Sequence, residues 1–314
     1  MGIIFIAGEI DADVWRDVLA AELPEIDFDT DFYVWPDRPT DPGDIDIALV
    51  WRPPENALSE FPGLACVINL GSGVDSILND ETYPRHVPLV RMIDPALTRH
   101  MTEFVIQRVL TFHRKFHVYD SFQRNHDWKE MRQEDTLTKR VGILGLGELG
   151  SDAARVLASI GFDVAGWSRR EKTIDGVQSF FGEDAFTPFL GRTDILVCLL
   201  PLTEATRGIL NADTLSQLPE GAYVINAARG GHQVEADLLA ALDSGHLAGA
   251  ALDVFNEEPL PASSPIWDHP KVLVTPHIAS LSSPGSAARE IAANIRRIRK
   301  GEEPTDQVSL DAGY

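Results

Sequence analysis

Short apolar runs alternate with helical and turn-rich stretches along the first hundred residues. The runs fall at residues 3–7, 28–35, 45–51, 65–71 and 87–92. Each run has the length of a buried strand, and several of the stretches between them have room for a crossover helix, so the rhythm is that of a parallel sheet. We therefore expect residues 1–98 to form an α/β domain.

A long helical pattern and a second series of apolar runs follow. Apolar positions at helical spacing predict a helix from about Thr98 to Arg124. The later runs fall at residues 141–144, 164–167, 195–199, 223–226, 249–253 and 272–275. Six strands suit a dinucleotide-binding sheet, so we expect a second α/β domain over residues 99–280. The basic amphipathic pattern at 286–300 predicts a helix that returns to the first domain, which residues 281–314 would complete.

Composition fits two domains without a membrane anchor. The chain has 314 residues, of which 44% are hydrophobic, enough to bury a large core. The apolar stretch at 195–200 is too short to span a bilayer, and the first six residues lack the basic lead of a secretory signal. The two cysteines, Cys66 and Cys198, each lie in an apolar run, which argues against a disulfide framework or a metal site. A reducing cytoplasm is the expected location.

The charge of the chain restricts its partners. A formal net charge of −21 argues against nucleic acid and anionic membranes, because both require a basic surface. An anionic small molecule would therefore need a local positive field. Arg169, Arg170 and Arg229 are the candidates to supply it.

A glycine-rich segment separates an apolar run from a helical pattern in the second domain. Its residues are Gly145, Leu146, Gly147, Glu148, Leu149 and Gly150. A strand that turns sharply into a helix presents backbone N–H groups and the positive end of the helix dipole to a pyrophosphate, and glycines permit close approach. The segment therefore indicates a dinucleotide site, although glycines also occur in ordinary strand-to-helix turns.

The end of the next strand bears on the choice of dinucleotide. Ser168 stands there, roughly 20 residues after the glycines, where an acid would bond the 2′-hydroxyl of NAD and repel a 2′-phosphate. The chain instead has a neutral hydroxyl followed by Arg169 and Arg170. Guanidinium groups bond phosphate oxygens in pairs and stay charged, so we predict NADP as cofactor, with NADPH preferred over NADH. The alternative is that both arginines are merely solvated.

Three polar residues follow strands of the second domain. Arg229 lies after the run at 223–226, Glu258 after that at 249–253, and His277 after that at 272–275. Taken singly, they are explained by a surface charge, a Glu-Pro turn and a structural histidine. Ligands of open α/β sheets bind beyond the carboxyl ends of strands, so the three side chains could also converge on one site.

Taken together, these motifs resemble those of the D-isomer-specific 2-hydroxyacid dehydrogenase family over nearly the whole chain. The matching segments are residues 71–75, 145–150, 201–206, 226–231, 253–259 and 275–279. Residues 50–54, 166–169 and 242–245 are most similar to the glyoxylate/hydroxypyruvate reductase A subgroup. The resemblance implies two doubly wound parallel sheets, in a flavodoxin-like substrate domain and a Rossmann cofactor domain.

The resemblance also implies residue roles. His277 would donate a proton to a keto oxygen, with Glu258 on its other ring nitrogen favouring the imidazolium, and Arg229 would bind the substrate carboxylate and polarise the ketone. The cofactor would contact the glycine segment, Ser168, Arg169, Arg170, Leu200, Pro201, Thr206, Ala227, Ala228, Arg229 and Asp253. The substrate would contact Trp51, Gly71, Ser72 and Gly73 as well as Arg229 and His277. The alternatives are that residues 71–73 form an ordinary turn and that Trp51 belongs to the core.

The implied reaction is NADPH-dependent reduction of glyoxylate to glycolate and of hydroxypyruvate to D-glycerate. The resemblance implies a homodimer, in which Trp128 of one subunit reaches the active site of the other; the alternative is a surface or interface role for Trp128. Two alternatives stay open: a reductase for another or bulkier 2-oxo acid such as phenylpyruvate, and a non-catalytic nucleotide sensor. A sensor needs only the cofactor site, so the presence of Arg229, Glu258 and His277 together counts against it.

Overall fold

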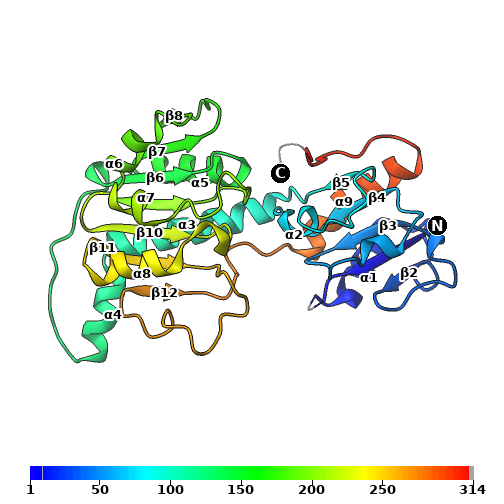
Figure 1. The fold of residues 1–314 in the computed structure, drawn as a ribbon, viewed down its shortest axis with the longest axis horizontal. Helices are drawn as coiled ribbons and strands as arrows, with labels where there is room; N and C mark the ends of the chain where they lie inside the picture. Colours follow the sequence, from blue (N-terminus) through cyan, green and yellow to red (C-terminus); the bar gives the residue numbers. More distant parts are fainter. Residues whose placement is uncertain (9, 311–314) are drawn as a thin grey trace. The chain divides into compact units, whose positions relative to one another are not determined.

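The computed structural model describes residues 1–8 and 10–310, and it divides into two compact units. The first unit comprises Met1–Leu97 together with the segment that begins at Leu281, and the second comprises Thr98–Ser280. The boundary falls inside helix α3 (Pro95–His113). Each unit is built around its own parallel sheet (Figure 1).

The described part of the first unit contains a five-stranded sheet in the order β2-β1-β3-β4-β5. Its strands are β1 (Gly2–Ile6), β2 (Phe32–Val34), β3 (Ile45–Val50), β4 (Cys66–Asn69) and β5 (Leu89–Val90). All paired neighbours run parallel. This order is that of flavodoxin-like folds, so the expected fold class is confirmed for this unit. Strand β2 is shorter than its apolar run, because residues 28–31 form a turn.

Helices from the two ends of the chain cover this sheet together. The helices are α1 (Ala12–Glu22), α2 (Asp75–Leu78) and α9 (Pro284–Arg299), with short 3-10 turns at Pro42–Asp44 and Leu58–Glu60. The apolar face of α9 shares one buried cluster with β1, α1 and β3, and Figure 1 shows the orange-red α9 among the blue elements. Arg296 bonds Glu25, and Arg299 bonds Asp46. These bonds fix the returning helix to the start of the chain.

A seven-stranded parallel sheet in the order β12-β11-β10-β9-β6-β7-β8 forms the second unit. Its strands are β6 (Arg140–Leu144), β7 (Asp163–Ser168), β8 (Val177–Phe181), β9 (Ile195–Cys198), β10 (Ala222–Asn226), β11 (Leu247–Leu252) and β12 (Val272–Val274). The expectation of six strands missed β8. This edge strand has no fully buried residue, so its sequence, VQSFF, carries no apolar run that would mark it.

Six helices of the second unit accompany the sheet. They are α3, α4 (Phe116–Arg124), α5 (Glu148–Ser159), α6 (Phe186–Gly191), α7 (Ala212–Ser216) and α8 (Glu235–Asp243), with 3-10 turns at Thr136–Thr138 and Gly230–His232. The single helix predicted from Thr98 to Arg124 is in fact α3 and α4. Lys115 between them has a left-handed backbone (φ 60°), which ends one helix and redirects the chain. After α4, an extended connection runs along the outside of the unit (Figure 1).

Both cysteines are buried free thiols. Burial raises the pKa of Cys66 and of Cys198 to about 12, so neither thiol ionises readily near neutral pH. Among the described residues, no helix combines the length and the apolar character needed to cross a membrane.

Candidate active site

Three neighbouring strands of the second unit, β10, β11 and β12, end at the same edge of the sheet, and their following loops are hydrogen-bonded to one another. The N–H of Asp253 after β11 donates to the carbonyl of Asn226 at the end of β10 (3.0 Å). The N–H of His277 after β12 donates to the carbonyl of Asp253 (2.8 Å). The loops that carry Arg229, Glu258 and His277 are therefore neighbours.

His277 and Glu258 form a side-chain pair at this edge. Nδ1 of His277 lies 2.8 Å from Oε2 of Glu258, and the two side chains are 21% and 17% exposed. The other oxygen, Oε1, accepts a hydrogen bond from the N–H of Phe255 (3.0 Å), which fixes the carboxylate. An ionised carboxylate only accepts, so Nδ1 carries the hydrogen and Nε2 is the nitrogen directed elsewhere.

The backbone of His277 is left-handed (φ 54°), which is uncommon outside glycine and has to be held in place. Asp253 holds it, because its carboxylate accepts from the N–H groups of Ile278 (3.0 Å) and Ala279 (2.8 Å). Asp253 is fully buried, so its charge needs compensation. These two bonds supply part of it, and the Arg108 guanidinium on α3 acts on the same carboxylate.

Arg229 follows β10 in a loop that packs tightly on the segment carrying Glu258. A Cβ at the next residue, Gly230, would overlap the backbone of Phe255, so only glycine fits there. Asn226, fully buried, donates through Nδ2 to the carbonyl of Arg229 (3.0 Å) and accepts through Oδ1 from the N–H of Ala228 (3.1 Å). Ala227 and Ala228 are buried beside it. The backbone of Arg229 is thus fixed by the bonds of Asn226 to Ala228 and to Arg229 itself, and by the packing of Gly230 on Phe255.

The glycine segment makes the sharp turn from β6 into α5 that the sequence predicts. Gly145 has φ 98°, and a Cβ there would lie 2.7 Å from the Leu199 carbonyl oxygen. A Cβ at Gly150 would overlap the carbonyl oxygen of Gly145, whereas one at Gly147, the N-cap of α5, would meet nothing within 4 Å. Glu148 and Leu149 begin the helix, whose positive end thus has an open approach at Gly147.

The residues predicted to distinguish the two dinucleotides end β7. Ser168 is 9% exposed, and its hydroxyl donates to the carbonyl of Arg170 (2.6 Å). This bond folds the chain back so that Arg169 and Arg170 stand together, both exposed, at the end of the strand. Two guanidinium groups next to the open N-terminus of α5 in sheet order suit a phosphate-bearing ribose, so this edge fits the predicted cofactor.

A second turn lies after β9, between β6 and β10 in the sheet. Leu200 is buried, and the hydroxyl of Thr206 donates to the carbonyl of Pro201 (2.7 Å) while accepting from the N–H of Thr203 (2.8 Å). These bonds close residues 201–206 into a compact loop beside the glycine turn.

The remaining predicted substrate residues belong to the first unit. Trp51, after β3, packs on Gly71, after β4, so closely that a Cβ at Gly71 would overlap the indole ring. Asn69 shapes this turn by donating through Nδ2 to the carbonyls of Gly71 (2.7 Å) and Gly73 (2.9 Å). Trp51, Gly71, Ser72 and Gly73 are therefore brought together at one carboxyl edge, and their contact with substrate stays a prediction.

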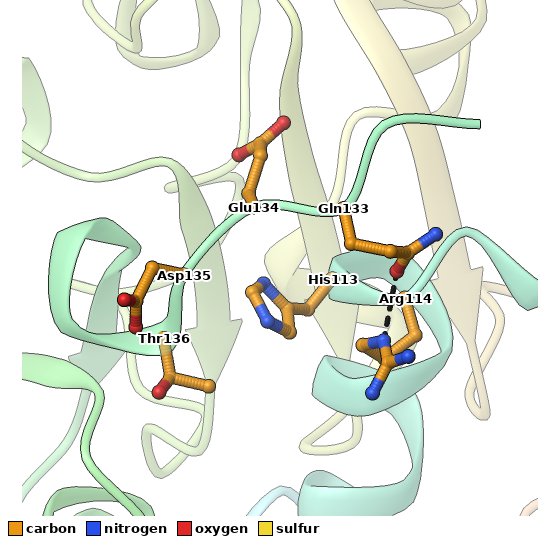
Figure 2. A pocket seen from close by; sticks show the side chains of 6 residues that line it. All are labelled: His113, Arg114, Gln133, Glu134, Asp135 and Thr136. Carbon is orange, nitrogen blue, oxygen red and sulfur yellow. Dashed lines mark hydrogen bonds between the residues drawn. The ribbon is translucent and has the colours of Figure 1, made fainter.

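The structure also holds a cavity of about 480 Å³ that is separate from this edge. Figure 2 shows its lining, with the His113 ring from α3 facing the loop that carries Glu134 and Asp135. Thr136, also in the lining, lies just before β6, so the cavity opens at the amino end of that strand. It is therefore not the dinucleotide site.

Sequence patterns missed the side chains that hold the loops. Asn226 is a buried polar residue at the end of an apolar run, which is a usable signal for a loop anchor. His232, three residues after Arg229, is fully buried and contacts two loops. Its position close to Arg229 is a sequence signal, but its contact with Pro201 could not be predicted because the two residues are 31 positions apart.

Comparisons with known proteins agree with this geometry. Residues 106–279 match the family model described as D-isomer specific 2-hydroxyacid dehydrogenase, NAD binding domain. Glyoxylate/hydroxypyruvate reductase A of Serratia proteamaculans is 43% identical over 321 residues, covering all of both chains. The protein of the same name from Photorhabdus laumondii is 42% identical over 319 residues, again covering both chains fully.

Two solved structures resemble the whole chain. A D-isomer specific 2-hydroxyacid dehydrogenase from Xanthobacter autotrophicus in complex with NADPH and MES has a TM-score of 0.93 at 43% identity, with 100% of this chain and 99% of that one covered. The NADPH-dependent glyoxylate/hydroxypyruvate reductase from Sinorhizobium meliloti with NADP and sulfate has a TM-score of 0.92 at 39% identity, with the same coverage.

Proposed function

The chain belongs to the D-isomer specific 2-hydroxyacid dehydrogenase family, and we propose that it reduces glyoxylate to glycolate and hydroxypyruvate to D-glycerate with NADPH. The observation that carries the chemistry is the His277–Glu258 pair at the carboxyl edge of the sheet. Reduction of a 2-oxo acid needs a hydride donor at the keto carbon and a proton donor at the keto oxygen. When bound, NADPH supplies the hydride.

His277 is the proposed proton donor. Glu258 holds Nδ1, so Nε2 is the ring nitrogen available to a keto oxygen, and a general acid there can give its proton to that oxygen. The N–H groups of Ile278 and Ala279 donate to the Asp253 carboxylate, which holds the left-handed backbone that carries the ring.

Arg229 is the proposed anchor for the substrate carboxylate. Its planar guanidinium can bond two oxygens at once, and its charge opposes the negative charge that develops on the keto oxygen. A protein of net charge −21 repels an anionic substrate in general, so a fixed local cation is needed. In the first unit, the Gly71–Gly73 turn and Trp51 are proposed as further substrate-binding residues.

The cofactor is proposed to lie along the carboxyl edge of the second sheet. The N-terminus of α5 at Gly147 would take the pyrophosphate, and Arg169 with Arg170 would take the 2′-phosphate. Between these positions and Arg229, the cofactor would pass the turn after β9, with Leu200, Pro201 and Thr206, and the start of the loop after β10, with Ala227 and Ala228. The buried Asp253 is proposed to face the nicotinamide carboxamide. The two buried thiols support a reducing cytoplasm as the place of reaction.

The test is NADPH oxidation followed at 340 nm with glyoxylate, hydroxypyruvate, pyruvate and phenylpyruvate. We expect the two small substrates to give the highest kcat/KM, and His277→Ala to lower kcat by about 10²-fold or more. His269→Ala is the matched control, because His269 also faces an acid, Asp243, at 3.4 Å, but lies before β12 and not at the site. A higher kcat/KM with phenylpyruvate would change the proposed substrate class to bulkier 2-oxo acids. Absence of turnover with all four acids would favour a non-catalytic nucleotide sensor.

Cofactor choice has its own test. Wild-type kcat/KM with NADPH is expected to exceed that with NADH, and Ser168→Asp to narrow or reverse the difference, because the new carboxylate repels a 2′-phosphate. Equal use of both nucleotides by the wild type would contradict the assignment of Arg169 and Arg170.

A homodimer is proposed through α4 and the connection after it. None of the α4 residues is fully buried although the helix carries Phe116, which is 56% exposed, and Trp128 on the connection is 98% exposed. Aromatic surface of this kind is typical of an interface, and a second copy of the chain would cover it. Trp128→Ala is expected to weaken the dimer in light scattering and to raise the substrate KM, whereas Trp267→Ala, at 49% exposure elsewhere, leaves both unchanged.

A further inference from the structure

His232 makes two side-chain contacts that join neighbouring loops of the second unit. Nδ1 lies 3.1 Å from the carbonyl oxygen of Arg229, and Nε2 lies 3.2 Å from the carbonyl oxygen of Pro201. The residue is fully buried in the short helical turn Gly230–His232. One ring thus spans the loop after β10, which carries the proposed substrate arginine, and the loop after β9, which lines the proposed cofactor path.

Backbone bonds reinforce the same junction. The N–H of Gly208 donates to the carbonyl of Gly231 (2.9 Å), and the N–H of Leu210 donates to the carbonyl of His232 (2.8 Å). These bonds fix the later part of the β9–β10 connection. The ring of His232 alone, among the side-chain bonds described, links the Arg229 carbonyl to the Pro201 carbonyl.

The two contacts differ in how much other support their acceptors have. The Arg229 carbonyl also accepts from Nδ2 of Asn226 (3.0 Å) and from the N–H of His232 (3.2 Å). The Pro201 carbonyl also accepts from the hydroxyl of Thr206 (2.7 Å), a bond within its own loop. The ring is therefore a side-chain link between the Pro201 loop and the arginine loop, in addition to the backbone bonds of Gly208 and Leu210, and it does not close either loop by itself.

We propose that His232 is a positioning residue that holds the Arg229 loop and the Pro201 loop at a fixed separation, so that affinity for the 2-oxo acid and affinity for NADP(H) are set together. This inference rests on the proposed function, in which Arg229 binds substrate and Pro201 lines the cofactor path. Carbonyl oxygens only accept, so the neutral ring donates to one of the two carbonyls and lies against the other. An apolar side chain at this position makes neither polar contact.

The test compares His232→Leu with His246→Leu. His246 makes a similar bond, from Nε2 to the Leu215 carbonyl (2.9 Å), but lies just before the amino end of β11. For His232→Leu we expect the Kd for NADPH and the KM for glyoxylate each to rise about 5- to 30-fold, because the substitution removes a hydrogen bond and the side-chain link between the two loops. We expect kcat to change less, because His277 and Glu258 are on other loops. For His246→Leu we expect a lower Tm with Kd and KM unchanged.

Two further variants sharpen the result. His232→Gln can donate from one amide nitrogen, so it restores one of the two contacts and is expected to give intermediate constants; it also serves if the leucine variant does not fold. Thr206→Val removes hydroxyl bonds to Pro201 and Thr203 that lie inside the Pro201 loop, and it is expected to raise the NADPH Kd while leaving the glyoxylate KM within about twofold.

The inference is overturned if His232→Leu binds NADPH and glyoxylate within twofold of the wild type, or if His246→Leu with the same loss of Tm shows the same kinetic change. Failure of the proposed function is distinct, since it appears as absence of turnover in the wild type. In that case the NADPH titrations of the His232 and Thr206 variants still report on the coupling of the two loops.

Discussion

The glycines of the β6–α5 turn have different tasks, and substitution by alanine separates them. A Cβ on Gly150 would fall well inside 3.0 Å of the carbonyl oxygen of Gly145, closer than real Cβ contacts come, and that partner is backbone, which moves only with the turn. A Cβ on Gly147 would meet nothing within 4 Å, and its backbone (φ −77°, ψ −164°) is open to alanine. We expect Gly150→Ala to lower stability and Gly147→Ala to weaken NADPH binding.

The magnitudes follow from these geometries. Overpacking of this kind costs about 1–3 kcal/mol, and in a unit the size of Thr98–Ser280 each kcal/mol lowers Tm by about 2–4 °C, so Gly150→Ala is expected to lose about 2–12 °C. For Gly147→Ala the stability change is expected to stay within about 0.5 kcal/mol. Its methyl group would occupy the space through which a pyrophosphate approaches the helix, and an increase in Kd of about tenfold or more corresponds to at least ~1.4 kcal/mol.

Thermal unfolding measures the first effect, and titration of NADPH fluorescence measures the second. The reasoning fails if Gly147→Ala unfolds as early as Gly150→Ala, since its Cβ would then be in contact with protein. It also fails if Gly147→Ala binds NADPH as well as the wild type, because the open space at the start of α5 would then not be where the nucleotide lies.

Three other outcomes are expected. Because the net charge is −21, raising NaCl from 0.1 to 1 M is expected to raise Tm by about 2–4 °C or more, and a flat or falling Tm would show that self-repulsion is unimportant. Burial, with Lys139 and Arg114 adding to it, lowers the pKa of His113, so the unfolded chain binds the extra proton first and stability is lost as pH falls through about 6.5. Unfolding at pH 7.5 and pH 5.5 is expected to differ less in His113→Phe than in the wild type, with the exposed His86→Gln as control. Asp194 accepts three bonds from Arg140, which outweigh burial and lower its pKa, so Asp194→Ala is expected to reduce Tm by about 2–8 °C; an unchanged Tm would mean that water replaces the pair.

The sequence predicted most of both sheets because their strands are buried and therefore appear as apolar runs. Strand β8 was not predicted because it is an edge strand without a fully buried residue. The helix break at Lys115 was not predicted because a left-handed backbone at a lysine has no sequence signal. Such features depend on tertiary contacts, and local propensity does not report them.

The site divides in the same way. Arg229, Glu258 and His277 could be selected from the sequence because parallel strands end at one edge of a sheet, and the 2.8 Å contact between the latter two is what that rule leads to. The different surroundings of Gly147 and Gly150 could not be predicted from the sequence, because the residue type is the same at both positions. The contact between His232 and Pro201 joins residues 31 positions apart, and nothing in either local segment indicates it.

The return of α9 to the first unit has a consequence for the order in which the protein is made. The second unit is one uninterrupted stretch of chain, whereas the first draws Ala288, Ile291 and Ile295 from a helix that is translated after the whole second unit. The part translated first is therefore completed last. Until α9 emerges, β1, α1 and β3 lack part of their apolar cover, and the nascent chain carries a finished Rossmann unit behind an unfinished N-terminal one.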